Sequence, residues 1–271
     1  MKKLIAGPWV GEFGWELFAW QGYIRSLSKH FEHTTVISRK TSKALYEDFA
    51  DNFIAHQPHG TIVDSFFMHG VDFSKDIKKI ITDHQIKLDS NTSLVLPRRI
   101  GIPPHTHYTE AIKFGAYDIQ PEYKIFGSQQ DIDIDYVFHI RNRKTVRPKD
   151  NWDIDNWIKL RELLGDDKKI ACVGTRAESG WIEDTIDMRN IELQSLFNLL
   201  YNCKCVFGPS SGPMHLASLC KTKHIVWGSR KLSLDRYETT WNPHQTPVIF
   251  ADKHGWHPPP EYIYENFRNW T

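Results

Sequence analysis

A strand, a tight turn and a helix follow one another directly in residues 205–218, and this run constrains the fold more than any other. The run begins with apolar Cys205 to Phe207, continues through glycine, proline and serine, and ends in a helical pattern that carries His215. Such a pattern predicts a buried strand entering a helix through a sharp turn. The first N–H groups of a helix have no intrahelical acceptor and lie at the positive end of its dipole. The turn therefore predicts a site for an anion such as a diphosphate.

Short apolar runs alternate with helical patterns along most of the chain, which is typical of a parallel α/β fold. The expected strands cover 3–9, 34–38, 61–63, 93–96, 135–140, 169–173, 205–207 and 223–227. The expected helices cover 15–29, 42–49, 75–83, 109–114, 153–164 and 190–200, with a last one after Pro260. Asp153 is placed to cap its helix.

Composition excludes several classes. The 271 residues carry a net charge of +1, so no global charge favours nucleic acid or an anionic membrane, although a local basic patch is compatible with it. No apolar run approaches the ~18–20 residues that span a bilayer, and the apolar start of the chain is too short for a signal peptide. The four cysteines lie in apolar patterns, which predicts buried, reduced thiols and a cytoplasmic location.

The run from Ile186 to Gly228 resembles the nucleotide-sugar-binding half of the heptosyltransferase-like GT-B glycosyltransferases, the ADP-heptose:LPS heptosyltransferase type. In that family a helix precedes a strand, a turn of the type Asp/Ser-Ser/Thr-Gly-Pro-x-His-Leu-Ala, and a strand ending in glycine. The resemblance implies an α/β protein of two Rossmann-like domains facing a cleft. It also implies transfer of a sugar from a nucleoside diphosphate sugar to a hydroxyl acceptor, by metal-independent displacement with inversion and without a cofactor.

On this basis we expect residues 1–130 to form an acceptor-binding domain and residues 131–250 a nucleotide-sugar-binding domain. Residues 251–271 are expected to form a tail or helix that packs back toward the first domain. The acceptor implied by the family is a saccharide, with a modified nucleobase in DNA as the alternative. The sequence says nothing about oligomeric state.

The resemblance implies that the turn holds the donor diphosphate and that its histidine points toward the phosphates or ribose. The residues concerned are Ser210, Ser211, Gly212, Pro213, Met214 and His215. Family members often carry Asp in place of Ser210, so any role of that carboxylate is absent or moved. The alternative is a plain turn with capping serines and a core histidine.

A second site follows the first strand, where Gly11 and Gly14 allow a tight loop that opens a helix. In the family this loop reads Gly-Asp, and its carboxylate is the proposed general base. Glu12 takes that position, with Glu16 in reserve and Trp15 on the acceptor side. A carboxylate suits the chemistry because the acceptor hydroxyl must lose a proton. Otherwise Glu12 is only a carboxylate stabilised near a helix N-terminus.

Two further loops leave the carboxyl ends of expected strands, where open α/β sheets bind ligands. Arg141 and Arg143 lie in the basic loop of residues 138–149, and guanidinium groups suit phosphate. This loop could equally be solvated, or bind a nucleic-acid backbone. In the loop of residues 173–179, the resemblance assigns Glu178 to the ribose hydroxyls and Arg176 to a phosphate. An ordinary turn is the alternative there.

Two other functions remain open from the residues. Gly208 to Gly212 spells Gly-x-Ser-x-Gly, the nucleophile elbow of α/β-hydrolases, with Ser210 as nucleophile and with Asp235 and His244 or His254 following in order. Two features count against a hydrolase. Too few residues follow Ser210 for the remaining strands of a hydrolase sheet. The strand before Ser210 is also expected to be the third strand of a half-domain rather than a central strand of one large sheet. The other alternative is a non-catalytic protein that binds sugar nucleotides.

Metal sites are weakly indicated. Asp131, Asp133 and Asp135 alternate before a strand, and several histidines lie in loops without companion ligands at a recognisable spacing. We therefore expect no metal. Trp9, Trp15 and Trp181 lie near polar turns, where tryptophan could wall a sugar or base pocket.

Overall fold

The computed structural model describes residues 2–9, 11–57, 73–97, 120–145, 147–229 and 234–270. The chain divides into two compact units, Met1–Tyr123 and Lys124–Thr271, so the division falls seven residues before the expected one at 130. Each unit is built on a parallel sheet, which confirms the α/β class. The strand expected at 61–63 and the helix expected at 109–114 fall outside the described residues.

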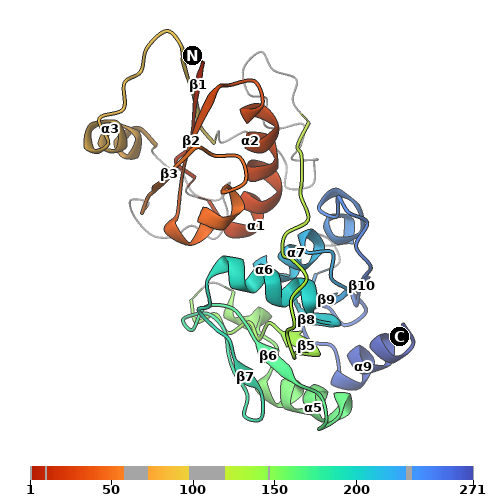
Figure 1. Ribbon diagram of the computed structural model, residues 1–271. Helices are drawn as coiled ribbons and strands as arrows, with labels where there is room; N and C mark the ends of the chain where they lie inside the picture. The colour runs from red at the N-terminus through yellow and green to blue at the C-terminus, as the bar shows by residue number, and fades with distance from the viewer. Residues whose placement is uncertain are drawn as a thin grey trace. The chain divides into compact units, whose positions relative to one another are not determined.

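The first unit has a four-stranded parallel sheet in the order β3-β2-β1-β4. The strands are β1 (Lys3–Ala6), β2 (His33–Ser38), β3 (Asn52–Ala55) and β4 (Thr92–Val95). The strand β3 was not predicted, because its short run is flanked by polar residues. Helix α2 (Gln21–Ser28) covers one face of the sheet and α3 (Phe73–Asp83) the other (Figure 1). Ile80 of α3 packs in one core cluster with Ile5, Ile37 and Ile54 of the sheet.

The helix expected at 15–29 is assembled from three pieces. A short α1 (Phe13–Trp15) leads through a π-helical turn, η1 (Glu16–Trp20), into α2. The helix expected at 42–49 is shorter and earlier, a 3-10 helix η2 (Lys40–Leu45). A π-helical turn adds a residue to the local repeat and is frequent at functional sites. Here it follows α1, whose N-cap residue is Glu12.

The second unit has a six-stranded parallel sheet in the order β10-β9-β8-β5-β6-β7. The strands are β5 (Tyr136–Phe138), β6 (Ile170–Cys172), β7 (Ile186–Asp187), β8 (Cys205–Pro209), β9 (His224–Trp227) and β10 (Val248–Phe250). Strand β8 therefore lies inside the sheet, between β9 and β5. The short edge strands β7 and β10 were not predicted.

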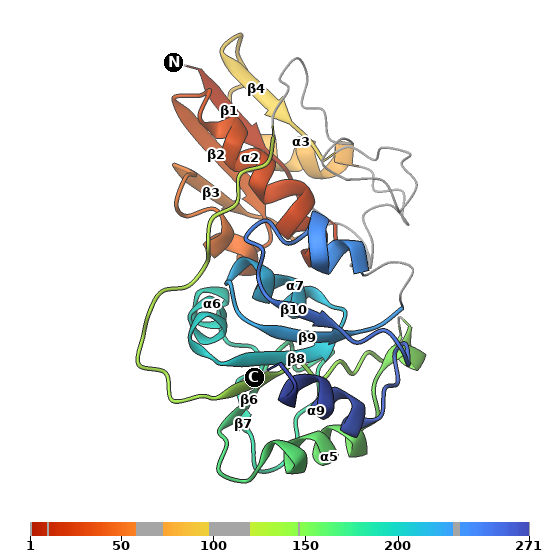
Figure 2. The same cartoon turned by 90° about the vertical axis from the view of Figure 1, so that its right-hand side faces the viewer.

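Helices cover both faces of this sheet, α6 (Leu193–Asn202) and α7 (Gly212–Leu219) on one and α5 (Ile154–Leu164) and α9 (Pro260–Arg268) on the other (Figure 2). Asp153 caps α5 as predicted, accepting from the N–H of Asp155 at 3.4 Å. Two short turns complete the unit, the 3-10 helix η3 (Pro148–Asp150) and the π-helical η4 (Arg236–Thr240).

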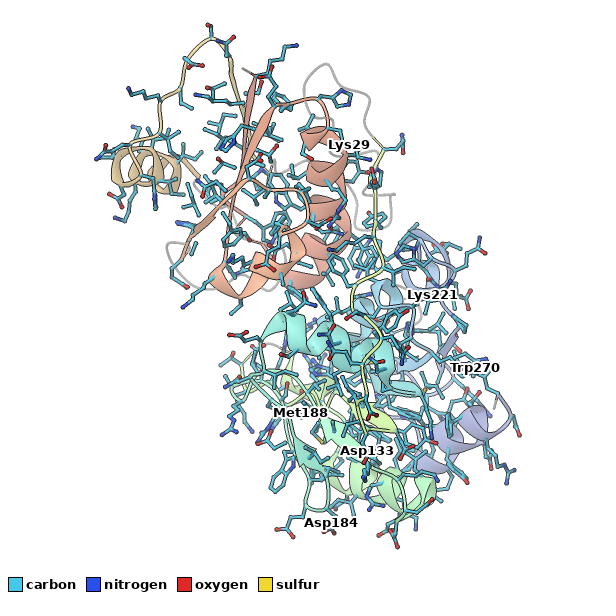
Figure 3. All side chains as sticks on the ribbon, viewed as in Figure 1. Lys29, Asp133, Asp184, Met188, Lys221 and Trp270 are labelled. Carbon is cyan, nitrogen blue, oxygen red and sulfur yellow. The ribbon has the colours of Figure 1, made fainter. Side chains whose placement is uncertain are left out.

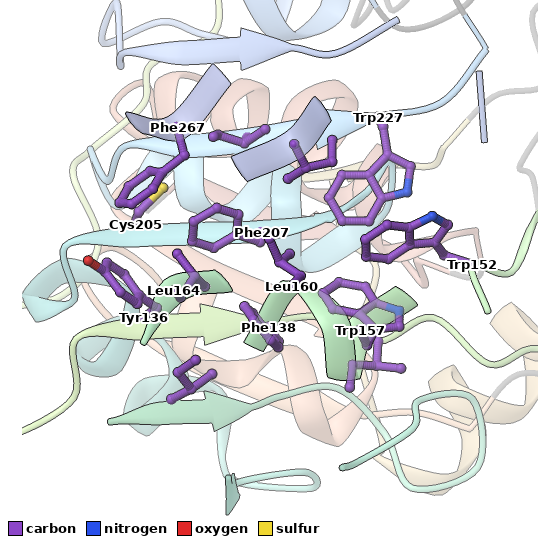
Figure 4. Close-up of a cluster of buried hydrophobic side chains, with 14 of the residues drawn as sticks. Tyr136, Phe138, Trp152, Trp157, Leu160, Leu164, Cys205, Phe207, Trp227 and Phe267 are labelled. Carbon is purple, nitrogen blue, oxygen red and sulfur yellow. The ribbon is translucent and has the colours of Figure 1, made fainter. Parts of the chain in front are cut away.

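An aromatic core lies between the sheet and the pair α5 and α9 (Figure 4). Phe138 contacts Trp157 at 5.0 Å between ring centroids, and Trp152 contacts Trp227 at 4.7 Å. Ile263 and Phe267 of α9 are buried in the same core. The C-terminal helix, which we expected to pack toward the first domain, thus buries its apolar face within the second unit. The reason is its amphipathic pattern, whose apolar side matches this aromatic surface.

The aspartates before β5 serve as lysine partners. Asp133, on the extended segment that leads to β5 (Figure 3), pairs with Lys169, and Asp135 accepts from Lys204 at 2.6 Å. Within the described ranges, no three His, Cys, Asp or Glu side chains gather closely enough to hold a metal ion. All four cysteines are free and buried, as predicted.

Candidate functional site

The carboxyl ends of four strands in the second unit bring several predicted loops to one sheet edge. Because β5, β6, β8 and β9 are parallel and in register, the residues that follow them lie side by side. Glycines allow the close packing there. A Cβ on Gly228 would lie 3.2 Å from the Cβ of Ser210, and one on Gly208 would lie 2.7 Å from the Sδ of Met214. The glycines therefore let the loops at the carboxyl ends of these strands pack closely, and their polar side chains gather there.

The serine turn, Ser210 to Pro213, links β8 to α7. Ser211 is the N-cap residue in extended conformation, and its side chain makes no capping hydrogen bond. Its Oγ is buried and has no hydrogen-bond partner. The N–H groups of Gly212 and Met214 belong to the first helical turn, where intrahelical acceptors are lacking, and Pro213 has no N–H. An unsatisfied buried hydroxyl beside open helix amides fits an anionic ligand.

His215 lies beneath this turn in an aromatic setting. Its ring stacks on Tyr237 with centroids 4.4 Å apart and meets Trp241 edge-on at 4.7 Å. Burial, with smaller effects from Arg236 and His224, holds its pKa well below the usual value. The imidazole is therefore neutral, and any contact with a phosphate is a hydrogen bond rather than a charge pair.

Arg141, which we expected to bind the donor phosphate, is buried and makes hydrogen bonds within the basic loop. Its side chain is only 4% exposed, and its Nη1 donates to Arg147 O at 3.0 Å and to Asn151 Oδ1 at 2.7 Å. The Asn151 side chain also bonds the main-chain N and O of Arg143, at 3.1 and 2.8 Å. Asn151, which sequence reasoning missed, thus holds the basic loop together, and Arg141 is one of its anchors.

Arg143 and Glu178 come together from separate loops. Arg143 Nε lies 3.6 Å from Glu178 Oε2, and the N–H of Asn142 donates to Glu178 O at 2.7 Å. Both side chains retain exposure, so this pair joins the basic loop to the 173–179 loop at the sheet edge. The fold brings these two predicted residues together, although their sequence positions gave no sign of an ion pair.

Arg176 turns to a different carboxylate. Its Nη2 lies 3.3 Å from Asp187, which also holds Arg189 through both carboxylate oxygens. The Arg189 guanidinium keeps the pKa of the Asp187 carboxyl far below its usual range. Asp187 is therefore a fixed negative group, and Arg176 is partly neutralised by it.

His139 is a polar group at the sheet edge that the sequence reading passed over. It follows β5, and its Nδ1 lies 3.2 Å from Val173 O. A carbonyl only accepts, so Nδ1 carries the proton and Nε2 is an acceptor. Burial lowers the pKa of His139 to about 4, and the nearby arginines Arg143 and Arg141 add to the effect. A neutral acceptor of this kind suits a hydroxyl of ribose or sugar.

Gly174 shapes the loop that follows β6. Its φ is +122°, and a Cβ there would lie 2.1 Å from Ser179 Oγ. We expect Gly174→Ala to lower the free energy of unfolding by about 3 kcal/mol, combining backbone strain with a clash. Gly255→Ala is the matched control. Gly255 also has a positive φ, +60°, but no atom lies within 4 Å of the added Cβ. Equal losses in the two variants, measured by urea denaturation, would contradict the clash.

In the first unit, the loop after β1 presents Glu12 as the half-buried N-cap residue of α1. The Arg39 guanidinium donates to Gly11 O and ties this loop to the end of β2. Gly14 and Trp15 are buried, with Trp15 only 5% exposed, and Trp9 is fully buried. Neither tryptophan walls an open pocket, whereas Trp181 is 40% exposed.

Glu16 is fully buried, which removes it as a reserve base. Its carboxylate accepts hydrogen bonds from three hydroxyls, those of Ser38, Ser42 and Tyr46, the last two at 2.7 Å. Burial raises its pKa above the ordinary value in spite of these donors. Glu16 therefore anchors the π-helical turn below the Glu12 loop rather than meeting an acceptor.

The raised pKa of Glu16 makes a pH-dependent prediction. The folded protein binds the Glu16 proton more tightly than the unfolded chain does. The contribution of this carboxyl to the free energy of unfolding is therefore complete below its ordinary pKa. It is lost as the pH rises through the raised one. The Glu16→Gln variant does not titrate there. The free energy of unfolding of Glu16→Gln minus that of wild type should therefore increase from about pH 4 to about pH 8. A constant difference in urea titrations across this range would refute it.

The backbone at Ser210 does not support a nucleophile elbow. Such an elbow strains its serine, yet the described non-glycine residues with positive φ are Gln85, Arg147, Asp184, Asn190, Lys221 and Gln245. Ser210 is not among them. Strand β8 lies inside its sheet, so our argument from the position of this strand does not count against a hydrolase. The absence of a positive φ at Ser210 is a better argument against it.

Comparison with known proteins finds solved structures of similar fold. Escherichia coli ADP-heptose LPS heptosyltransferase II is 12% identical with a TM-score of 0.63, over 99% of this chain and 98% of that one. E. coli heptosyltransferase WaaC bound to ADP-2-deoxy-2-fluoro heptose is 10% identical with a TM-score of 0.60, over 100% of both chains. A glycosyl transferase family 9 protein from Veillonella parvula is 12% identical with a TM-score of 0.60, over 93% and 86%.

No protein-family model and no curated protein matches the sequence. At these identities the likeness establishes the fold, and it confirms the GT-B architecture of the heptosyltransferases that residues 186–228 suggested. The cleft expected between the two domains stays a prediction. Among the described residues, no helix combines the length and apolar character needed to cross a bilayer.

Proposed function

We propose that this protein transfers a sugar from a nucleoside diphosphate sugar to a hydroxyl acceptor. The observation that carries the proposal is the serine turn, where the buried, unpartnered Ser211 Oγ lies beside the first amides of α7. Two of the similar solved structures support it, because one is an ADP-heptose LPS heptosyltransferase and the other, WaaC, holds ADP-2-deoxy-2-fluoro heptose. ADP-heptose is therefore the first donor to test.

The mechanism we propose is a direct displacement with inversion. Glu12 takes the proton of the acceptor hydroxyl as that oxygen attacks the anomeric carbon. The amides of Gly212 and Met214, together with the Ser211 hydroxyl, hold the departing diphosphate, and Arg143 adds positive charge. Glu178 and the neutral His139 accept hydrogen bonds from ribose or sugar hydroxyls. Arg141 orders the loop that carries Arg143. No metal ion is required.

The proposed acceptor is a saccharide. A modified nucleobase in DNA is the alternative, and the net charge of +1 supplies no electrostatic argument for it. The fold does not separate an enzyme from a protein that binds sugar nucleotides without turnover. Measured turnover separates them.

The decisive experiment is a thermal-shift screen with ADP-, UDP-, GDP- and CMP-sugars, followed by an assay for release of the nucleoside diphosphate. We expect stabilisation by ADP-heptose and, with an acceptor glycan, release of ADP. Absence of any shift would refute the proposal. Binding without turnover would indicate a protein that binds sugar nucleotides without catalysis. Labelling of Ser210 by a fluorophosphonate probe would instead support a serine hydrolase.

A further inference from the structure

Tyr237 approaches the serine turn from a segment that belongs to none of the sequence motifs. It lies on η4, between β9 and β10, and is fully buried. Asn242 fixes the segment by donating to Tyr237 O at 2.9 Å and by bonding both main-chain groups of Thr246, at 2.7 and 2.8 Å. The main chain at Tyr237 is therefore held in place by the Asn242 side chain.

The Tyr237 hydroxyl contacts the polar groups of the serine turn. Its oxygen accepts from the N–H of Ser211 at 3.3 Å and donates to Ser210 Oγ at 3.4 Å. The ring stacks on His215, with Phe250 beyond it at 5.8 Å. Both hydrogen bonds are long, as such bonds often are before a ligand arrives.

We propose that Tyr237 is a positioning residue for the anion site, acting through the serine turn. Capping of a helix is normally the task of the N-cap side chain, but Ser211 makes no such bond. The Tyr237 hydroxyl accepts from the N-cap residue's own N–H, the bond that an N3 side chain makes in a capping box, and so fixes the Ser211 main chain. The Ser211 hydroxyl itself stays without a partner and faces a ligand. The same hydroxyl donates to Ser210 Oγ, so one group fixes both serines of the turn. The inference rests on the proposed function.

The chemistry of the ligand follows from this arrangement. The turn offers hydroxyl and amide donors, and its organising group is a neutral phenol rather than a carboxylate. A carboxylate in that place would repel a phosphate, whereas a phenol does not. The site thus suits the phosphate groups of the ligand, and Tyr237 should affect phosphate binding without affecting contacts to a base or ribose.

The test is Tyr237→Phe, which keeps the ring stacked on His215 and removes only the oxygen. Calorimetric titration would use ADP, inorganic pyrophosphate and adenosine as probes. We expect affinity for ADP and for pyrophosphate to fall roughly tenfold, the size of one lost hydrogen bond to a charged network, with adenosine unaffected. Tyr136→Phe is the control, because Tyr136 lies in the same unit at the start of β5, the opposite end of the sheet.

Unchanged pyrophosphate and ADP affinity in Tyr237→Phe would overturn the inference, and so would an equal loss for all three probes, which indicates a structural role. If Tyr237→Phe fails to fold, Ser210→Ala removes the acceptor of the phenol and should show the same selective loss. Its binding like wild type would also overturn the inference. Failure of wild type to bind ADP or pyrophosphate would refute the proposed function itself, so the two failures are distinguishable.

Discussion

Replacing Glu12 with glutamine is expected to lower the turnover of donor and acceptor about 10²–10⁴-fold, the usual contribution of a general base. Glutamine has the shape of glutamate but accepts no proton near neutral pH. Glu12 is an N-cap residue whose side chain makes no capping bond, so the start of α1 should survive the change. Donor affinity should stay near wild type, because the donor is assigned to the second unit. The loss should appear in kcat rather than in donor KM.

Two variants make this result specific. Glu12→Asp keeps the carboxylate and should retain much of the rate, whereas Glu47→Gln alters an exposed carboxylate paired with Lys43 and should have no effect. Near wild-type turnover by Glu12→Gln would remove Glu12 from the base role. The Gly11–Glu12 loop, tied down by Arg39, would then have only a structural purpose.

The second large effect is expected for the serine turn. The double variant Ser211→Ala, His215→Gln should weaken binding of ADP-sugar about 10–100-fold, because hydrogen bonds to charged groups contribute about 1.5–3 kcal/mol. Ser211 supplies the unpartnered hydroxyl, and His215 supports the turn from below through its contact with Tyr237. Glutamine keeps a polar side chain at position 215 and limits the cavity that alanine would leave.

Calorimetry with ADP measures this loss directly. The paired control is Ser128→Ala, His257→Gln, which changes the same two residue types at exposed positions of the same unit. The control should bind like wild type. If the serine-turn variant keeps both its melting temperature and its affinity, the diphosphate does not bind at the start of α7, and the proposed site is wrong.

Local patterns were enough to predict much of the second unit. The apolar run before Gly208 indicated β8 within two residues of its actual bounds, and the Gly-Pro pair after Ser211 indicated that a helix, α7, follows the turn. Asp153 marked the start of α5. Signals of this kind are local, because glycine, proline and capping side chains act within a few residues of themselves. The short strands β3, β7 and β10 carry too few residues for a period to show.

For the site residues too, local sequence patterns indicated the positions but not the partners of the side chains. Glu12 was the expected base and Glu16 the reserve four residues later. The structure separates them, because Glu12 is a half-buried N-cap residue and Glu16 is fully buried among three hydroxyls. Arg141 and Arg143 were expected to bind phosphate together, but Arg141 is buried and its Nη1 donates to Asn151 and to Arg147 O. These outcomes depend on partners distant in the sequence, and no local pattern reports them.

The amino-acid sequence by itself determined most of the longer strands and helices, the position of the serine turn and the parallel character of both sheets. These follow from hydrophobic period and turn chemistry, which are properties of neighbouring residues. Only the tertiary structure decided which charged groups remain available and which are used to hold loops, and only it brought Tyr237 to the turn. The physical reason is that burial and pairing are set by residues that meet in space, and desolvation then decides whether a side chain serves the fold or the ligand.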